Sequence, residues 1–260
     1  MNRSVRWLRL FGRGWLMHSK HLASSGFFVL MTSVQPLVFA SLAFFLFGAG
    51  RPADALLDAA LGAAMLSVWS TTLIGSGQAL TLLRAAGLLE LLVAAPAPLA
   101  FVLAPITVAT ATIGLYAMVS TVAWGVLLFD LPLRLEHPGA LIAAVAVTAF
   151  GLGMLGMVFA SVFVRLRYAN ALTNLFDYPV WLLSGMLVPV DVLPLWTRPL
   201  SWLLPSTWGM RAIRESVLGG RPWFAIGICL GLGTGYLGLG LLTVRWFSTL
   251  ARRRAALALA

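Results

Sequence analysis

Long stretches without a charged residue are the feature that most constrains how this chain folds. A helix needs about 20 mostly apolar residues to cross the hydrocarbon core of a bilayer. Five uncharged stretches exceed that length, and a sixth, at 168–190, is interrupted only by Asp177. The sequence therefore predicts an all-α integral membrane protein with six transmembrane helices, near 27–48, 59–81, 100–128, 139–163, 171–188 and 223–244.

Basic residues are distributed unevenly between the two predicted sides of the membrane. The chain of 260 residues carries a formal charge of +10. With a cytoplasmic N-terminus and six crossings, most Lys and Arg fall in short cytoplasmic segments, whereas the two short outer loops hold only Arg51 and Arg134. The charge therefore indicates orientation in the plasma membrane, with both termini cytoplasmic, rather than a nucleic-acid partner.

The N-terminal segment, 1–25, separates apolar and basic side chains around a helix. Trp15 shares one side of the helical wheel with Leu8, Phe11 and Leu22. We expect an amphipathic helix in the membrane interface, with its basic side toward lipid headgroups or a partner. An ordinary positive flank that only fixes orientation is the alternative. The predicted basic side consists of Arg6, Arg9, Arg13 and Lys20.

The predicted outer segment 189–221 is neither a simple loop nor a span. Prolines recur along it, and Trp196, Trp202 and Trp208 lie between them. Tryptophan prefers the interface between water and lipid. We therefore expect two short re-entrant helices that dip into the outer leaflet before the last span.

Several chemistries are missing from the sequence. The only lysine, Lys20, follows no glycine-rich phosphate loop, so the chain has no nucleotide-binding motif of that kind. No nucleophile motif and no metal-ligand spacing occur either. We predict that the chain is not an enzyme and holds no metal or other cofactor.

Asp177 is the one ionisable residue well inside a predicted span. Such residues are costly in a membrane and often contact a substrate or a proton path. With Asn174 and Trp181 it forms a possible substrate pathway. The alternative is structural, with the carboxylate bonded to Asn174, Tyr178 or a neighbouring helix.

Three glycines, Gly227, Gly231 and Gly235, recur at four-residue spacing in the last span. Small residues at this spacing let another helix approach closely, which predicts a helix-packing or dimer contact. The alternative is that glycine is simply common in membrane helices. No linker or repeat divides the chain, so 1–260 is predicted to be one domain.

The segment 82–98 is a short apolar elbow between two spans. It contains Arg84 and Glu90 and ends with two prolines. A short helix there would place Leu88 and Leu91 on one side and Glu90 on another. Such a helix can be held by a partner and by the membrane together, although a simple interfacial hairpin fits as well.

Two motifs in this order resemble the membrane subunit of a type-2 ABC exporter. One is "GLLELLVAAPAP" at 87–98, and the other begins "LSGMLVPVDVLP" at 183 and continues to 215. The resemblance implies that 82–98 is a cytoplasmic coupling helix, with Arg84, Gly87, Leu88, Glu90 and Leu91 contacting a separate ATPase subunit. Only Arg84 precedes "AAG", where the family usually has several charges, so this contact would be less ionic.

The resemblance also implies the function. Two permease copies, or one copy and a related permease, would form the pathway, and the partner ATPase would bind ATP and magnesium. We expect export of a hydrophobic or amphiphilic small molecule, such as a drug or antibiotic. A lipid-linked glycan or lipid is the alternative cargo. A proton-coupled carrier acting through Asp177 and a non-transporting membrane scaffold are alternatives of another kind.

Overall fold

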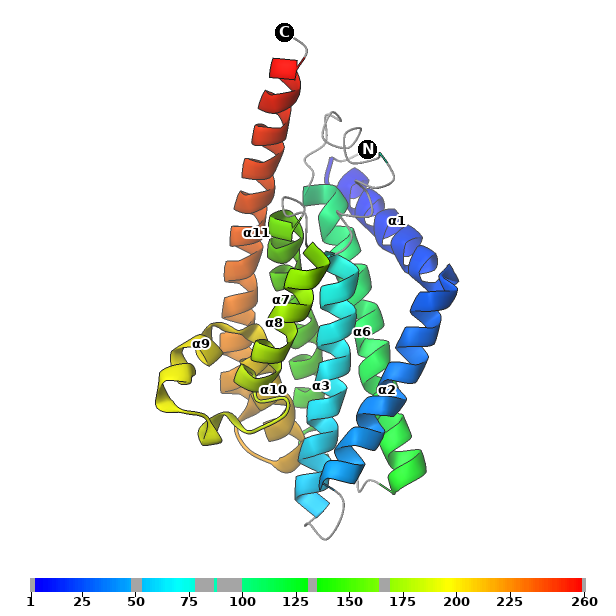
Figure 1. Ribbon diagram of the computed structural model, residues 1–260, viewed down its shortest axis with the longest axis vertical. Helices are drawn as coiled ribbons and strands as arrows, with labels where there is room; N and C mark the ends of the chain where they lie inside the picture. Colours follow the sequence, from blue (N-terminus) through cyan, green and yellow to red (C-terminus); the bar gives the residue numbers. More distant parts are fainter. Residues whose placement is uncertain are drawn as a thin grey trace.

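A computed structural model describes residues 3–47, 53–77, 87, 100–130, 135–163 and 169–258. All regular structure in these ranges is helical, and Figure 1 shows it as an elongated bundle. The elements are α1 (Arg3–Ser24), α2 (Gly26–Phe47), α3 (Ala53–Gly77), α6 (Ala100–Phe129), α7 (Pro138–Phe163), α8 (Ala169–Leu183), η1 (Val190–Val192), η2 (Leu195–Thr197), α9 (Arg198–Leu203), α10 (Pro205–Leu218) and α11 (Pro222–Ala258).

Four described helices are long and apolar enough to cross a membrane. These stretches are Asp54–Thr72, Leu103–Phe129, Pro138–Ala160 and Pro222–Trp246. Helix α2 contributes a shorter apolar stretch, Thr32–Phe45. The all-helical membrane fold is therefore confirmed. Within the described residues, four of the predicted spans are long and apolar enough to cross the membrane, and the number of six stays a prediction.

Helix α8 is shorter than the predicted span at 171–188. Its 15 residues reach only about 22 Å at 1.5 Å per residue, less than the hydrocarbon thickness of about 30 Å. The helix ends because the chain turns at Ser184 and Gly185, where the glycine has a φ of +78°. Only glycine adopts that backbone without strain.

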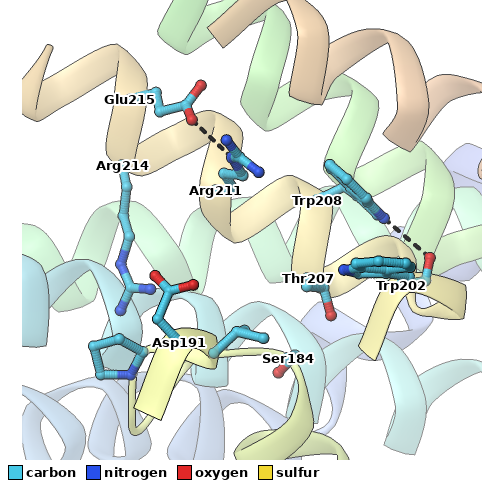
Figure 2. Close-up of a pocket in the computed structure, with 10 residues that line it drawn as sticks. Ser184, Asp191, Trp202, Thr207, Trp208, Arg211, Arg214 and Glu215 are labelled. Carbon is cyan, nitrogen blue, oxygen red and sulfur yellow. Dashed lines mark hydrogen bonds and ion pairs between the residues drawn. The ribbon is translucent and has the colours of Figure 1, made fainter. Parts of the chain in front are cut away.

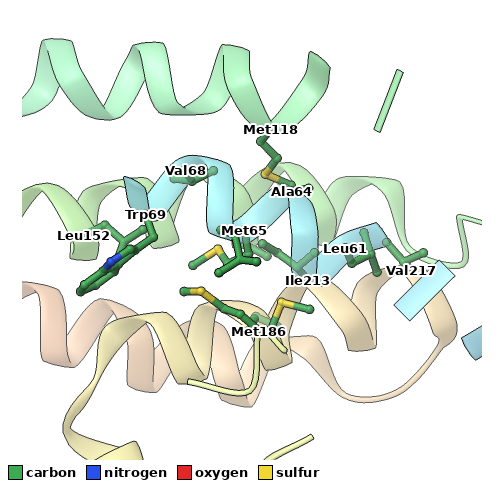
Figure 3. Close-up of a cluster of buried hydrophobic side chains, with 14 of the residues drawn as sticks. Leu61, Ala64, Met65, Val68, Trp69, Met118, Leu152, Met186, Ile213 and Val217 are labelled. Atoms are coloured by element: carbon green, nitrogen blue, oxygen red, sulfur yellow. The ribbon is translucent and has the colours of Figure 1, made fainter. Parts of the chain in front are cut away.

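Helix α3 lies at the centre of the bundle. Every residue from 60 to 72 is buried, and Met65, Val68 and Trp69 are among the most deeply buried side chains. Figure 3 shows this core, to which α6, α7 and α10 also contribute. The hydroxyls of Ser67 on α3 and Thr121 on α6 share a 2.8 Å hydrogen bond inside it. This stretch of α3 carries no charge, and hydroxyls on it are bonded inside the bundle, as where Thr71 donates a 2.8 Å hydrogen bond to the Ser67 carbonyl, so all its sides can be buried.

The first turn of α3 begins before the predicted span at 59–81. The helix starts at Ala53 and so includes Asp54 and Asp58 near its N-terminus. Carboxylates are stabilised there by the positive end of the helix dipole.

At the C-terminal end of the chain, α11 continues from its apolar stretch to Ala258, and Figure 1 shows it extending beyond the bundle. The beginning of α1 and the end of α11 lie at the same end of the molecule.

Candidate functional site

The predicted coupling segment falls almost entirely outside the described residues. Arg84, Leu88, Glu90 and Leu91 are outside them, and Gly87 is described as an exposed turn residue. Gly87 has a φ of +68°, and no atom of the described residues lies within 4 Å of the position that a Cβ would occupy. The left-handed backbone conformation by itself accounts for glycine at this position.

Helix α1 packs obliquely against α6, as Figure 1 shows. Trp15 faces α6, and its Nε1 donates a 3.3 Å hydrogen bond to the Thr112 hydroxyl. Three of the predicted basic residues, Arg9, Arg13 and Lys20, are exposed, and Arg6 lies on the same helix. The apolar side of α1 thus meets the bundle rather than only the lipid.

Two polar residues on the packed side of α1 were not expected. Buried atoms of both, Nε2 of His18 and Oγ of Ser19, have no hydrogen-bond partner within the described part of the chain. Burial lowers the pKa of His18, and the nearby His21, whose ring centroid is 6.4 Å away, lowers it further. In the sequence, the one indication of this burial is that His18 and Ser19 lie next to Leu8, Phe11 and Trp15 on the helical wheel.

Asp177 is bonded to a neighbouring helix. Its carboxylate accepts a 2.8 Å hydrogen bond from Nε1 of Trp69 on α3. Asp177 is 8% exposed and Trp69 is 2% exposed. This contact matches the structural interpretation of Asp177, and it makes the residue part of the junction between α3 and α8.

Aromatic side chains surround this junction. Trp181 is half-buried, with the Tyr178 ring 5.2 Å away and the Phe39 ring 6.5 Å away, centroid to centroid. Nε1 of Trp181 is buried without a partner in the described residues, whereas Tyr178 is exposed. Asn174 lies one turn before Asp177 on α8. The predicted pathway residues therefore share one helix, whose outer side is aromatic and whose inner side carries a carboxylate.

The three predicted packing glycines do not contact another described helix. Gly227, Gly231 and Gly235 are exposed and have open space around their Cβ positions. The close contacts of α11 use other glycines, since Gly233 meets Phe150 and Gly240 meets Met157 on α7. The predicted contact of these three glycines with a second chain stays a prediction.

The segment 189–221, which we predict to lie on the outer side, contains two short α-helices, α9 and α10, preceded by the turns η1 and η2. The turn that leads into this segment packs closely against α3. The carbonyl oxygen of Met186 occupies the position that a Cβ on Gly62 would take. The last helix of the segment is held by Arg214, whose Nε and Nη2 both donate to the Asp58 carboxylate, the second bond being 3.0 Å long. Neither contact was predicted, because the partners are far apart in the sequence.

A pocket of about 360 Å³ lies between η1, α9 and α10. Figure 2 shows the aromatic rings of Trp202 and Trp208 on one side and the charged groups of Arg211, Arg214 and Asp191 on the other. The helices α9 and α10, which contribute residues to this pocket, lie away from the chain termini in Figure 1.

The comparison with protein families agrees with this layout. Residues 10–218, from α1 to the end of α10, match the family described as ABC-2 type transporter. The chain belongs to the ABC-2 type transporter family. A search of curated proteins found no matching relative.

Membership in the ABC-2 type transporter family identifies the chain as a transport permease rather than a catalytic domain. The matched range includes both sequence motifs, at 87–98 and 183–215. It also includes the junction at Asp177, the Asp58–Arg214 ion pair and the pocket between η1, α9 and α10. The last helix, α11, lies beyond the matched range.

Proposed function

We propose that this ABC-2 type permease is the membrane subunit of an ATP-driven exporter in the plasma membrane. Two copies, or one copy and a related permease, form the pathway, and a separate ATPase binds ATP and magnesium on the cytoplasmic side. The family match over residues 10–218 carries the proposal. The sequence itself has no phosphate loop, which supports a separate site of hydrolysis.

Force from the ATPase is transmitted through the segment 82–98, which connects α3 to α6. Residues 60–72 of α3 are buried, and the helix bonds to α8 through Trp69 and Asp177. A displacement of its end is therefore transmitted to α8, because both helices belong to one packed core. Coupling of this kind needs an element with two conformational states, and both the ATPase and the cargo must shift the equilibrium between them.

The cargo that we propose is a hydrophobic or amphiphilic small molecule. Helix α8 supports this, because Leu175, Tyr178 and Leu182 are exposed along one side. Tyr178 and Trp181 add aromatic surface, which suits an apolar or aromatic ligand. A lipid or lipid-linked glycan moved by the same architecture is the alternative cargo.

The test begins with the tagged permease purified in mild detergent, followed by mass spectrometry of co-purifying proteins. We expect a stoichiometric P-loop ATPase that is lost in Glu90→Arg. The matched control is Glu136→Arg, which makes the same charge change at an exposed site near Gly219, before α7.

Transport in vesicles then separates the remaining alternatives. Glu90→Arg should abolish ATP-dependent flux, and Glu136→Arg should leave it intact. Flux that survives ATP depletion and disappears in Asp177→Asn would support the proton-coupled carrier. A chain that binds no ATPase and moves no cargo would support the scaffold.

A further inference from the structure

We propose that the pocket between η1, α9 and α10 binds a primary ammonium group attached to an apolar body. The site is separate from the α3–α8 junction, and the proposal concerns binding, so it does not depend on the direction of transport. It rests on the charges of the pocket, on one exposed indole and on one buried hydroxyl.

The charges around the pocket leave one carboxylate uncompensated. Arg211 pairs with Glu215 at 2.7 Å, and Arg214 pairs with Asp58. Asp191 also lines the pocket and has no ion pair within the described residues. Because both guanidinium groups already have a carboxylate partner, Asp191 is the lining carboxylate without a counter-ion in the described part of the chain, and it favours a cationic group.

An indole surface lies beside these charges. Trp202 lines the pocket and is 57% exposed. Trp208 is already engaged, because Arg211 lies 5.8 Å from its ring centroid and its Nε1 donates a 3.0 Å bond to the Trp202 carbonyl. The face of Trp202 is therefore the one available to a ligand cation, which indole attracts more strongly than the other aromatic rings do.

A buried hydroxyl distinguishes among cations. Thr207 is 8% exposed and lines the pocket, and its Oγ1 has no hydrogen-bond partner in the described structure. Figure 2 shows it between Trp202 and Ser184. Buried hydroxyls normally have a partner. A primary ammonium can donate to this oxygen, whereas a quaternary ammonium has no N–H to give.

The surroundings of the pocket suit an apolar body on the ligand. Leu200 and Leu203 of α9, the helix that also carries Trp202, are exposed. Two sources share the required chemistry, a soluble amphiphilic amine and the ethanolamine headgroup of a phospholipid. In either, the ammonium occupies the pocket while the apolar part lies along α9.

The experiment uses the full chain in phosphatidylglycerol nanodiscs, with empty nanodiscs subtracted. The probe is 2-phenylethylammonium, and its binding is measured by calorimetry against the neutral 2-phenylethanol and the trimethylammonium analogue. We expect binding of the primary amine to be about tenfold tighter than that of either analogue. Equal binding of the alcohol would overturn the proposal.

Variants test the assignment residue by residue. Asp191→Asn, Trp202→Ala and Thr207→Val should each weaken binding of the primary amine, by about three- to thirtyfold. Thr207→Val should leave the affinity for the trimethylammonium analogue unchanged. The matched controls, Asp54→Asn and Trp196→Ala, change exposed residues outside the pocket and should have no effect. Thermal unfolding of each variant shows whether it is folded, and full-affinity binding by folded Asp191→Asn would overturn the proposal.

A lipid arm identifies the source of the ammonium group. In nanodiscs that contain phosphatidylethanolamine, a headgroup ligand lowers the apparent affinity for the probe, and native mass spectrometry finds that lipid on the wild type but not on Asp191→Asn. Unchanged probe affinity there supports a soluble amine. Failure of the ATPase co-purification would refute the proposed function and leave these binding results standing.

Discussion

The indole Nε1 of Trp69 on α3 donates a 2.8 Å hydrogen bond to the carboxylate of Asp177 on α8. The two residues are 108 positions apart, and both are buried. A carboxylate inside a membrane bundle is retained only at a cost in stability. This bond offsets part of that cost, and it joins the central helix to the shortest of the six helices that were predicted to span the membrane.

Replacing Asp177 separates its structural role from a role in transport. Asp177→Asn keeps an oxygen acceptor for Trp69, so we expect little loss of stability. Asp177→Leu leaves the buried indole N–H without an acceptor, which should lower the free energy of unfolding by about 1–3 kcal/mol. Thermal unfolding of the two purified variants measures the difference. Equal stability of Asn and Leu variants would show that the bond does not support the fold, and reduced flux in a stable Asn variant would support a substrate contact.

A side chain at Gly62 should disrupt the entry to the outer segment. A Cβ there would overlap the Met186 carbonyl oxygen, which is backbone and cannot move without the turn after α8. We expect Gly62→Ala to destabilise the permease by about 1–3 kcal/mol. The control is Gly12→Ala on α1, where no described residue lies within 4 Å of the added atom. If both variants melt at the same temperature, the close approach of Met186 to α3 is not maintained in the protein.

Local periodicity accounts for what could be predicted from the sequence. Apolar length identified α6, α7 and α11, because a membrane span needs about 20 apolar residues. The 3.6-residue period placed Trp15 on the apolar side of α1. These features depend only on neighbours in the chain.

Contacts between distant segments could not be predicted in the same way. Asp58 and Arg214 are 156 positions apart. From its sequence neighbours alone, each resembles an ordinary charged residue at the end of an apolar stretch. The glycine pattern of the last span was equally ambiguous. A wheel groups Gly227 with Gly231, yet it contains no information on which side of α11 meets α7, and the structure uses Gly233 and Gly240.

The Asp58–Arg214 ion pair should show energetic coupling between α3 and α10. The side chains are 26% and 20% exposed, and two nitrogens of the guanidinium contact the carboxylate. A double-mutant cycle with Asp58→Asn and Arg214→Gln should give a coupling energy of about 1–3 kcal/mol. The internal comparison is Arg211 with Glu215, a more exposed pair within one helix. That pair should give about 0.3–0.5 kcal/mol. Similar values for both cycles would contradict a special role for the pair that links the two helices.

Packing of α1 on α6 should weaken in acid because of His18. Burial, followed by the charge of His21, lowers the pKa of His18 from its ordinary value of 6.5. A histidine with a lowered pKa in the packed state is neutral there, while the detached helix takes up a proton more readily. Well above pH 6.5 both states are neutral, and the packed state carries no penalty. As the pH falls below 6.5 toward the lowered pKa, the detached state gains protons first and packing loses stability.

Hydrogen exchange of α1 in nanodiscs, corrected for the intrinsic pH dependence of exchange, measures this effect. Protection of α1 should fall between about pH 7 and pH 5, while protection of the buried helix α3 stays constant. His18→Gln should remove the pH dependence, because glutamine does not titrate. His21→Gln should leave a smaller dependence, because burial, the larger cause, still acts on His18. Acid-induced loss of protection that persists in His18→Gln would assign the effect to another group and refute this account of α1.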